Sequence, residues 1–90
     1  NQMYFEQGAV VRHKFKVDGF EFMREIARED DHISILISTV SNVYVTKTAV
    51  ASLSDIETAE EIIKQDVYTF IEEQTDELDK IMAYFSKGWG

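Results

Sequence analysis

The sequence predicts an α+β fold, a four-stranded antiparallel β-meander followed by one long C-terminal helix, continuous or kinked, that packs on one face of the sheet. Three observations predict this fold. Apolar and polar residues alternate from about residue 9 to 50, an Asp-Gly dipeptide interrupts the first alternating run, and the apolar spacing becomes helical from about 54 to 87. The 90 residues include no proline and no Gly/Ser-rich linker, so we expect a single domain over residues 1–90.

The first predicted element is a hairpin whose strands flank Asp18-Gly19. This dipeptide suits a two-residue type I′ turn, because both central residues of that turn need positive φ. The turn would bring opposite charges together across the outer face, pairing Lys16 with Glu21 and Arg12 with Glu25. On the inner face it would pair Val17 with Phe20, Phe15 with Phe22, His13 with Arg24 and Val11 with Ile26.

Two more strands are expected over residues 32–39 and 43–50, joined by a short loop. The alternation directs Ile33, Ile35, Ile37, Val43, Val45 and Ala49 toward the helix. In a simple meander, His13, Arg24, Ile35 and Lys47 would then share one inner row. The opposite, weakly charged face would carry Met23, Ser34, Leu36, Ser38, Tyr44, Thr46 and Thr48, an alternative contact surface.

The predicted helix begins at Ser54, where Ser54-Asp55-Ile56-Glu57 has the pattern of a capping box, and Gly88 is expected just past its end. Such a helix would be about 50 Å long, whereas eight-residue strands span about 27 Å. Part of it must overhang the sheet. Either it breaks near Thr75-Asp76-Glu77, or a second subunit covers the overhang; the apolar stripe stays in phase across Gln74, which favours a continuous helix and a homodimer. The stripe comprises Ile56, Ala59, Ile63, Val67, Phe70, Leu78, Ile81 and Phe85.

Charge is strongly segregated along the chain. Residues after Leu53 contain ten Asp/Glu and three Lys, and so carry −7 of the total net charge of −8. This excess argues against direct binding to nucleic acid, which requires clustered Lys and Arg. It is explained either by solubility or by a contact with a basic groove on another protein, of the kind that holds DNA or RNA, which would make the chain a DNA mimic. The residues expected to make that contact are Glu57, Glu61, Glu72, Asp76 and Asp79.

Catalytic and metal signatures are weak. The chain has no cysteine, no Gly-rich phosphate loop and no nucleophile elbow, and its two histidines stand apart, so we predict no enzymatic activity and no cofactor. Two groups of residues have side chains that suit divalent ions: Asp30-Asp31-His32, and the acids at 72, 76 and 79. A tight turn explains the first group and a solvated helix face explains the second, so we predict no metal site. A less favoured candidate is a pocket that binds an anion through His13, Arg24 and Lys47. The alternative is that these side chains lie at the margin of the helix and extend into solvent.

No apolar run approaches the roughly 20 residues that cross a bilayer, and the N-terminus lacks the pattern of a secretory signal, so we expect a soluble cytoplasmic protein without membrane contact.

The chain resembles a small family of uncharacterised proteins encoded by staphylococcal phages and prophages. The features that carry the resemblance are Met3-Tyr4, the hairpin 17–22, the helix segment 71–77 and a tryptophan next to the C-terminus. The family has no known function, so the resemblance implies no catalytic residues. The resemblance implies an accessory protein, made in the cytoplasm of a bacterial host, that binds and modulates a host or phage protein. The alternative is a structural or assembly protein that acts as a homo-oligomer.

Overall fold

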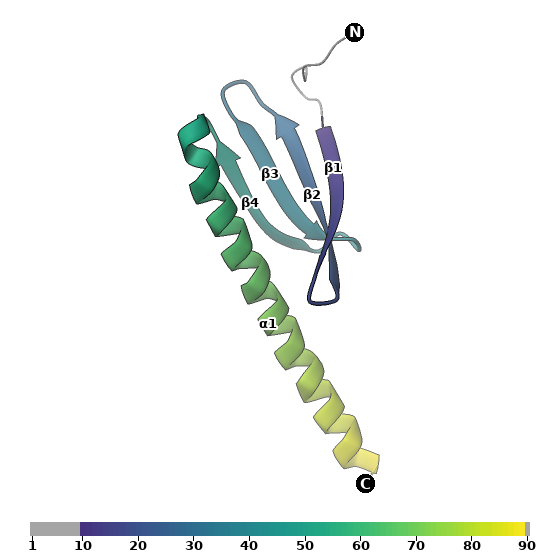
Figure 1. Cartoon of the computed structure of the whole chain (residues 1–90). Helices are drawn as coiled ribbons and strands as arrows, with labels where there is room; N and C mark the ends of the chain where they lie inside the picture. Colours follow the sequence, from purple (N-terminus) through teal and green to yellow (C-terminus); the bar gives the residue numbers. More distant parts are fainter. Residues whose placement is uncertain (1–9, 90) are drawn as a thin grey trace.

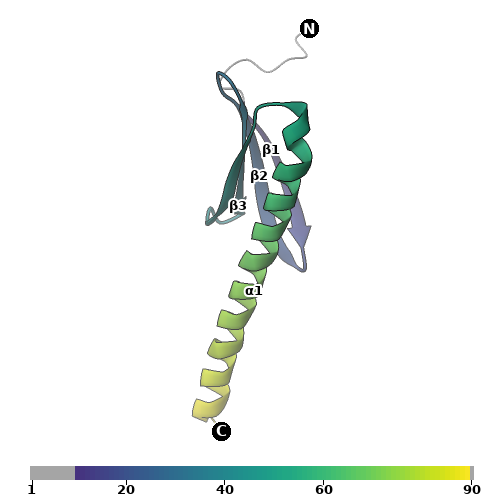
Figure 2. The ribbon, with the colours of Figure 1, turned by 90° about the vertical axis from the view of Figure 1, so that its left-hand side faces the viewer.

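The computed structural model describes residues 10–89, with Trp89 described by its backbone alone. Four strands, β1 (Val10–Val17), β2 (Phe20–Arg28), β3 (Ile33–Thr39) and β4 (Tyr44–Val50), form one antiparallel sheet in the order β1-β2-β3-β4. A short 3₁₀ turn, η1 (Leu53–Asp55), leads into α1 (Ile56–Trp89), which lies on one face of the sheet nearest β4 (Figures 1 and 2). The predicted α+β meander is therefore confirmed; residue 9, where the sheet was expected to begin, lies outside the described residues.

The β1–β2 hairpin has the predicted turn and register. Asp18 and Gly19 have φ of 50° and 85°, the left-handed values that a type I′ turn needs. Every predicted cross-strand pair is present, and the outer-face pair Arg12–Glu25 closes an ion pair with 3.1 Å between Nε and Oε1. Local turn chemistry alone therefore fixes this half of the sheet.

The β3–β4 ladder contains a β-bulge that the alternation did not reveal. Ser38 pairs with Tyr44 and Ile37 with Thr46, so Val45 is an extra residue on β4. One extra residue shifts all later side chains to the opposite face. The predicted inner positions of Ala49 and Lys47 are thus wrong, as are the predicted outer positions of Thr46 and Thr48. Val43, expected in the strand, precedes it and is exposed.

The buried core joins the sheet to the first half of α1. Phe22 and Ile37 are fully buried, and they form one cluster with Val67 and Ile71. Phe22 stacks on Phe15 with ring centroids 5.3 Å apart. It also meets Phe70 edge-on at 6.0 Å. The helix is therefore anchored by a few apolar residues that all lie before residue 72.

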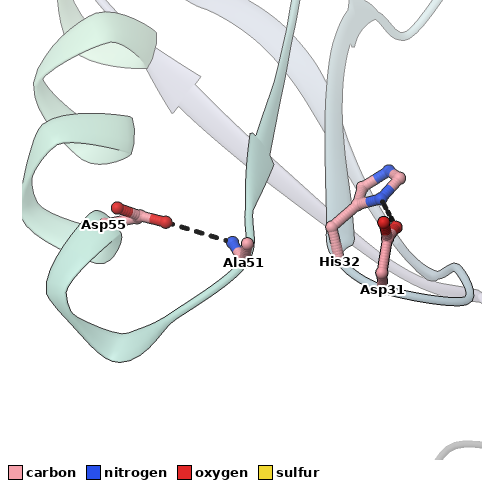
Figure 3. Close-up of polar contacts among 4 residues, drawn as sticks. All are labelled: Asp31, His32, Ala51 and Asp55. Atoms are coloured by element: carbon pink, nitrogen blue, oxygen red, sulfur yellow. Dashed lines mark hydrogen bonds and ion pairs between the residues drawn. The ribbon is translucent and has the colours of Figure 1, made fainter.

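The start of α1 differs from the prediction. The capping interaction uses Ser52 and Asp55, rather than Ser54 and Glu57. One oxygen of the Asp55 carboxylate accepts hydrogen bonds from the Ala51 and Ser52 amides, each at 3.2 Å (Figure 3, which draws the Ala51 bond). This bonding tightens the first turn into η1, and the α-helix proper begins at Ile56.

The second half of α1 projects beyond the sheet (Figures 1 and 2). The helix is continuous over 34 residues, so the predicted continuity past Gln74 is confirmed and the break near residues 75–77 does not occur. It also runs through Gly88, which was expected to end it. Every residue from Glu72 to Gly88 is exposed. We call residues 72–88 the overhang; at 1.5 Å per residue it is about 26 Å long.

Candidate functional site

The five predicted contact acids, Glu57, Glu61, Glu72, Asp76 and Asp79, are all exposed. Glu72 and Asp76 are one helical turn apart, and Glu61 precedes Glu72 by 11 residues, close to three turns. Because Val67 and Ile71 point into the core, this spacing places the acids on the outward side of α1. We call these five residues the acidic face. Among the described residues, the contacts Arg12–Glu25 and His32–Asp31 lie in the β half and involve none of these five acids.

Two other acids after Leu53 have structural roles, which a count of charges does not reveal. Asp55 caps the helix start. Asp66 is half-buried and accepts a 2.6 Å hydrogen bond from the Thr46 hydroxyl. This hydrogen bond to a half-buried acceptor ties α1 to β4. Part of the negative charge after Leu53 therefore serves the fold, and the bulge at Val45 is what brings Thr46 to the helix.

The predicted anion site is not assembled. The inner row is His13, Arg24, Ile37 and Thr46, where His13, Arg24, Ile35 and Lys47 had been expected. Lys47 pairs with Leu36 on the opposite face, because the bulge inverts β4. His13 and Arg24 do meet, with 3.4 Å between Nδ1 and Nη2. Arg24 Nε is buried and has no hydrogen-bond partner among residues 10–89.

A groove lies between α1 and the β1–β2 half of the sheet. One helix is about 10 Å wide, whereas four strands about 4.8 Å apart are wider, so a helix placed near β4 leaves β1 and β2 partly open. The groove has a volume of about 670 Å³. Its walls include His13, Phe15, Val17 and Arg24 from the sheet and Lys64 and Tyr68 from the helix. Sequence reasoning missed it, although the excess width of four strands over one helix was a signal for it.

The overhang carries apolar residues with nothing to cover them. Leu78, Ile81 and Phe85 continue the stripe of the docked half and are 54%, 45% and 53% exposed, while Met82 beside them is 66% exposed. Tyr84 lies at the margin and packs its ring edge-on against Phe85 at 5.2 Å. We call Leu78, Ile81, Met82 and Phe85 the overhang stripe. Contiguous exposed apolar patches are typical of interaction surfaces.

The Asp30-Asp31-His32 segment forms the β2–β3 turn. His32 Nδ1 lies 2.8 Å from Asp31 Oδ1 (Figure 3). The hydrogen bond to His32, and then the charge of that ring, hold the pKa of the Asp31 carboxyl below its ordinary value. Across residues 10–89, the structure gathers no group of three or more His, Asp or Glu side chains around a common point.

Within the described part of the chain, no helix has a stretch apolar and long enough to cross a bilayer. Comparison with protein families matches residues 3–86 to a family described as "Protein of unknown function (DUF1108)". Comparisons with curated proteins and with solved structures found no match.

Proposed function

We propose that this chain, which belongs to the DUF1108 family of proteins of unknown function, is a non-enzymatic binding protein. In this proposal its acidic face contacts a basic surface of another protein. The supporting observation is that Glu72, Asp76 and Asp79 lie on a helix segment that stands clear of the sheet. A protein partner can approach this segment without contacting the β half.

The electrostatic properties of the acidic face favour a partner that handles nucleic acid. Glu61 to Asp79 spans about 27 Å of rigid helix, along which carboxylates recur on one side. Regularly spaced negative charges on a rod are what a basic nucleic-acid groove is built to hold. Unneutralised exposed charges also accelerate encounter with a surface of opposite sign. This is the basis for regarding the chain as a DNA mimic.

The proposed setting is a bacterial host cell, in which the chain is a phage-encoded accessory protein that modulates a host or phage protein in the cytoplasm. The support for this setting is the sequence resemblance carried by the hairpin 17–22 and the helix segment 71–77. An acidic protein of this size, with its charge displayed on a projecting element, fits a modulator that occupies another protein's site.

Affinity capture with a charge-reversed variant tests the proposal. The test variant combines Glu72→Lys, Asp76→Lys and Asp79→Lys; the matched control carries Glu21→Lys on the sheet, also at an exposed acid. We expect the wild type and the control to capture the same basic protein from a bacterial lysate, in amounts that fall as salt rises. The triple variant should capture at least about tenfold less. Equal capture by all three proteins would overturn the proposed role of the acidic face.

The second candidate is a structural or assembly role as a homo-oligomer. The observation that favours it is the overhang stripe, which is apolar, continuous with the core-facing side of α1 and exposed. Sedimentation at several protein concentrations separates the two candidates, because self-association depends on concentration and an acidic contact depends on a second protein.

A further inference from the structure

We infer that two copies of this chain associate by reciprocal docking, with the overhang of each α1 lying in the groove of the other copy, over β1 and β2. The inference rests on the self-association candidate and adds the place where the second copy binds. In this arrangement the two α1 helices run antiparallel, side by side. Each helix packs on its own sheet with its first half and on the open part of β1 and β2 of the other sheet with its second half.

The dimensions of groove and overhang match. The groove lies over β1 and β2, and two strands are about 10 Å wide, which is the width of one helix. At its edge, Phe22 of β2 is already covered by Phe70 of α1. Strands of eight or nine residues are about 27–30 Å long, and the overhang is about 26 Å long. A second helix beside the first would therefore cover the part of the sheet that the chain's own helix leaves open, and so complete the helix layer.

The sequence of α1 repeats the side that packs on the sheet. Val67, Phe70 and Ile71, which pack in the core, recur eleven residues later as Leu78, Ile81 and Met82. Eleven residues are close to three helical turns, so both sets lie on one side of a nearly straight helix. The side of α1 that faces its own sheet in the first half is thus built to face a sheet in the second half as well.

Gln74 fits the same geometry. It is the polar residue on the apolar side of α1, and it lies between the docked half and the overhang stripe. In a reciprocal dimer this position falls near the two-fold axis, between the ends of the two sheets, where neither sheet covers it. The arrangement therefore gives a reason for a polar residue at this point.

Charge complementarity favours a second copy as the occupant. His13, Arg24 and Lys64 line the groove, and within the described part of the chain Arg24 Nε is buried without an acceptor. An arginine cannot lose its proton, so the guanidinium charge that Arg24 brings to the groove favours an acidic partner. The overhang carries five acids against two lysines, and among these acids Glu77 lies nearest the overhang stripe, one turn before Ile81.

Two-fold symmetry makes the contact occur twice, so each copy of it needs to bury only half the area of a stable dimer interface. Specific protein interfaces bury about 1,600 Å² in total, so each helix-on-sheet contact must supply about half. Two-fold symmetry gives two such contacts, each burying one overhang stripe and one apolar groove floor that includes Phe15 and Val17. The acidic face points away from both sheets and stays accessible to a different partner.

Engineered cross-links test the geometry, and the absence of natural cysteine makes them unambiguous. One variant carries His13→Cys in the groove and a second carries Ile81→Cys in the overhang stripe. The control for the first is Lys16→Cys, an exposed residue on the opposite face of β1 that does not line the groove. When variants are mixed and oxidised, we expect His13→Cys and Ile81→Cys chains to form a mixed disulfide dimer, and Lys16→Cys with Ile81→Cys to give at least about tenfold less.

Sedimentation equilibrium of the wild type supplies the second readout. We expect a species of twice the 10.4 kDa chain mass. We also expect Ile81→Glu to weaken dimerisation at least about 30-fold, while Glu72→Gln on the acidic face leaves it unchanged. A monomer at 100 µM wild type would overturn self-association altogether. A dimer in which Ile81→Cys chains link to each other, or in which the His13–Ile81 link fails, would overturn the reciprocal geometry and leave the self-association candidate standing.

Discussion

The hydroxyl of Thr46 on β4 donates a 2.6 Å hydrogen bond to the carboxylate of Asp66 on α1, which ties the helix to the strand nearest to it. Thr46 is buried. The bond exists because the extra residue Val45 turns Thr46 toward the helix. Together with the packing of Val67 and Phe70 on the core, it holds α1 on the sheet beside the groove.

Asp66→Ala should therefore destabilise the fold. The substitution leaves the buried Thr46 hydroxyl without its acceptor, a loss of about 1–3 kcal/mol in the free energy of unfolding. Urea denaturation measures this loss. In a Thr46→Val background the same Asp66→Ala change should cost markedly less, because no donor is then left unsatisfied; equal costs in the two backgrounds would show that the bond does not contribute.

Phe22→Ala should be among the most destabilising single changes. Phe22 is fully buried and contacts the rings of Phe15 and Phe70, so truncation leaves a cavity where sheet and helix meet. We expect a loss of about 3–5 kcal/mol in the free energy of unfolding. Tyr44→Ala is the matched control, an aromatic residue that is 64% exposed, and should cost less than about 1 kcal/mol. Similar losses for both would contradict the placement of the core.

Two glycine-to-alanine changes should have different effects on stability. Gly19 has φ of +85°, and a side chain there is strained even though nothing lies within 4 Å of the added Cβ. Gly19→Ala should cost roughly 1–2 kcal/mol in the free energy of unfolding. Gly88 lies inside α1 with open space around it, so Gly88→Ala should preserve stability and raise helix content slightly. Thermal melts and circular dichroism report both, and a stabilising Gly19→Ala would exclude the type I′ turn.

The Asp31–His32 pair should give a local pH signature. His32 holds the pKa of the Asp31 carboxyl below 3.8, so the folded state favours the charged form. A carboxyl whose pKa is lowered by folding contributes stability that is present above its ordinary pKa and lost as the pH falls through the lowered value. The contribution should be small because Asp31 is exposed to solvent. His32→Gln should return the pKa toward 3.8 in an NMR titration; an unchanged pKa would rule out His32 as the cause.

Local chemistry accounts for what the sequence predicted well. The register of β1 and β2 follows from Asp18-Gly19, because a two-residue turn leaves one way to pair the strands. The continuous helix follows from an apolar side that stays in phase across Gln74. Both predictions needed information from residues close in sequence, which is where pattern and turn preferences are informative.

The errors arise where a long-range contact outweighs the pattern. Val43 and Val45 made β4 look inward-facing, but pairing with β3 and the bond from Thr46 to Asp66 favour a bulge that inverts the strand. Lys47 therefore lies on the opposite face of the sheet from His13 and Arg24. The capping interaction also moved, from Ser54 to Ser52 with Asp55, because the chain enters the helix through a 3₁₀ turn. The groove depends on where α1 lies across the sheet, which single-residue periodicity does not encode.

The projecting helix has a hydrodynamic consequence. The radius of gyration is 17.2 Å, whereas a compact chain of 90 residues would have about 12 Å. A rod-like particle diffuses slowly for its mass, so even a single chain should elute from a sizing column ahead of spherical standards of the same weight. The elution volume will depend on the length of the particle. The number of chains in the particle should therefore be measured by a method that does not depend on shape, such as light scattering.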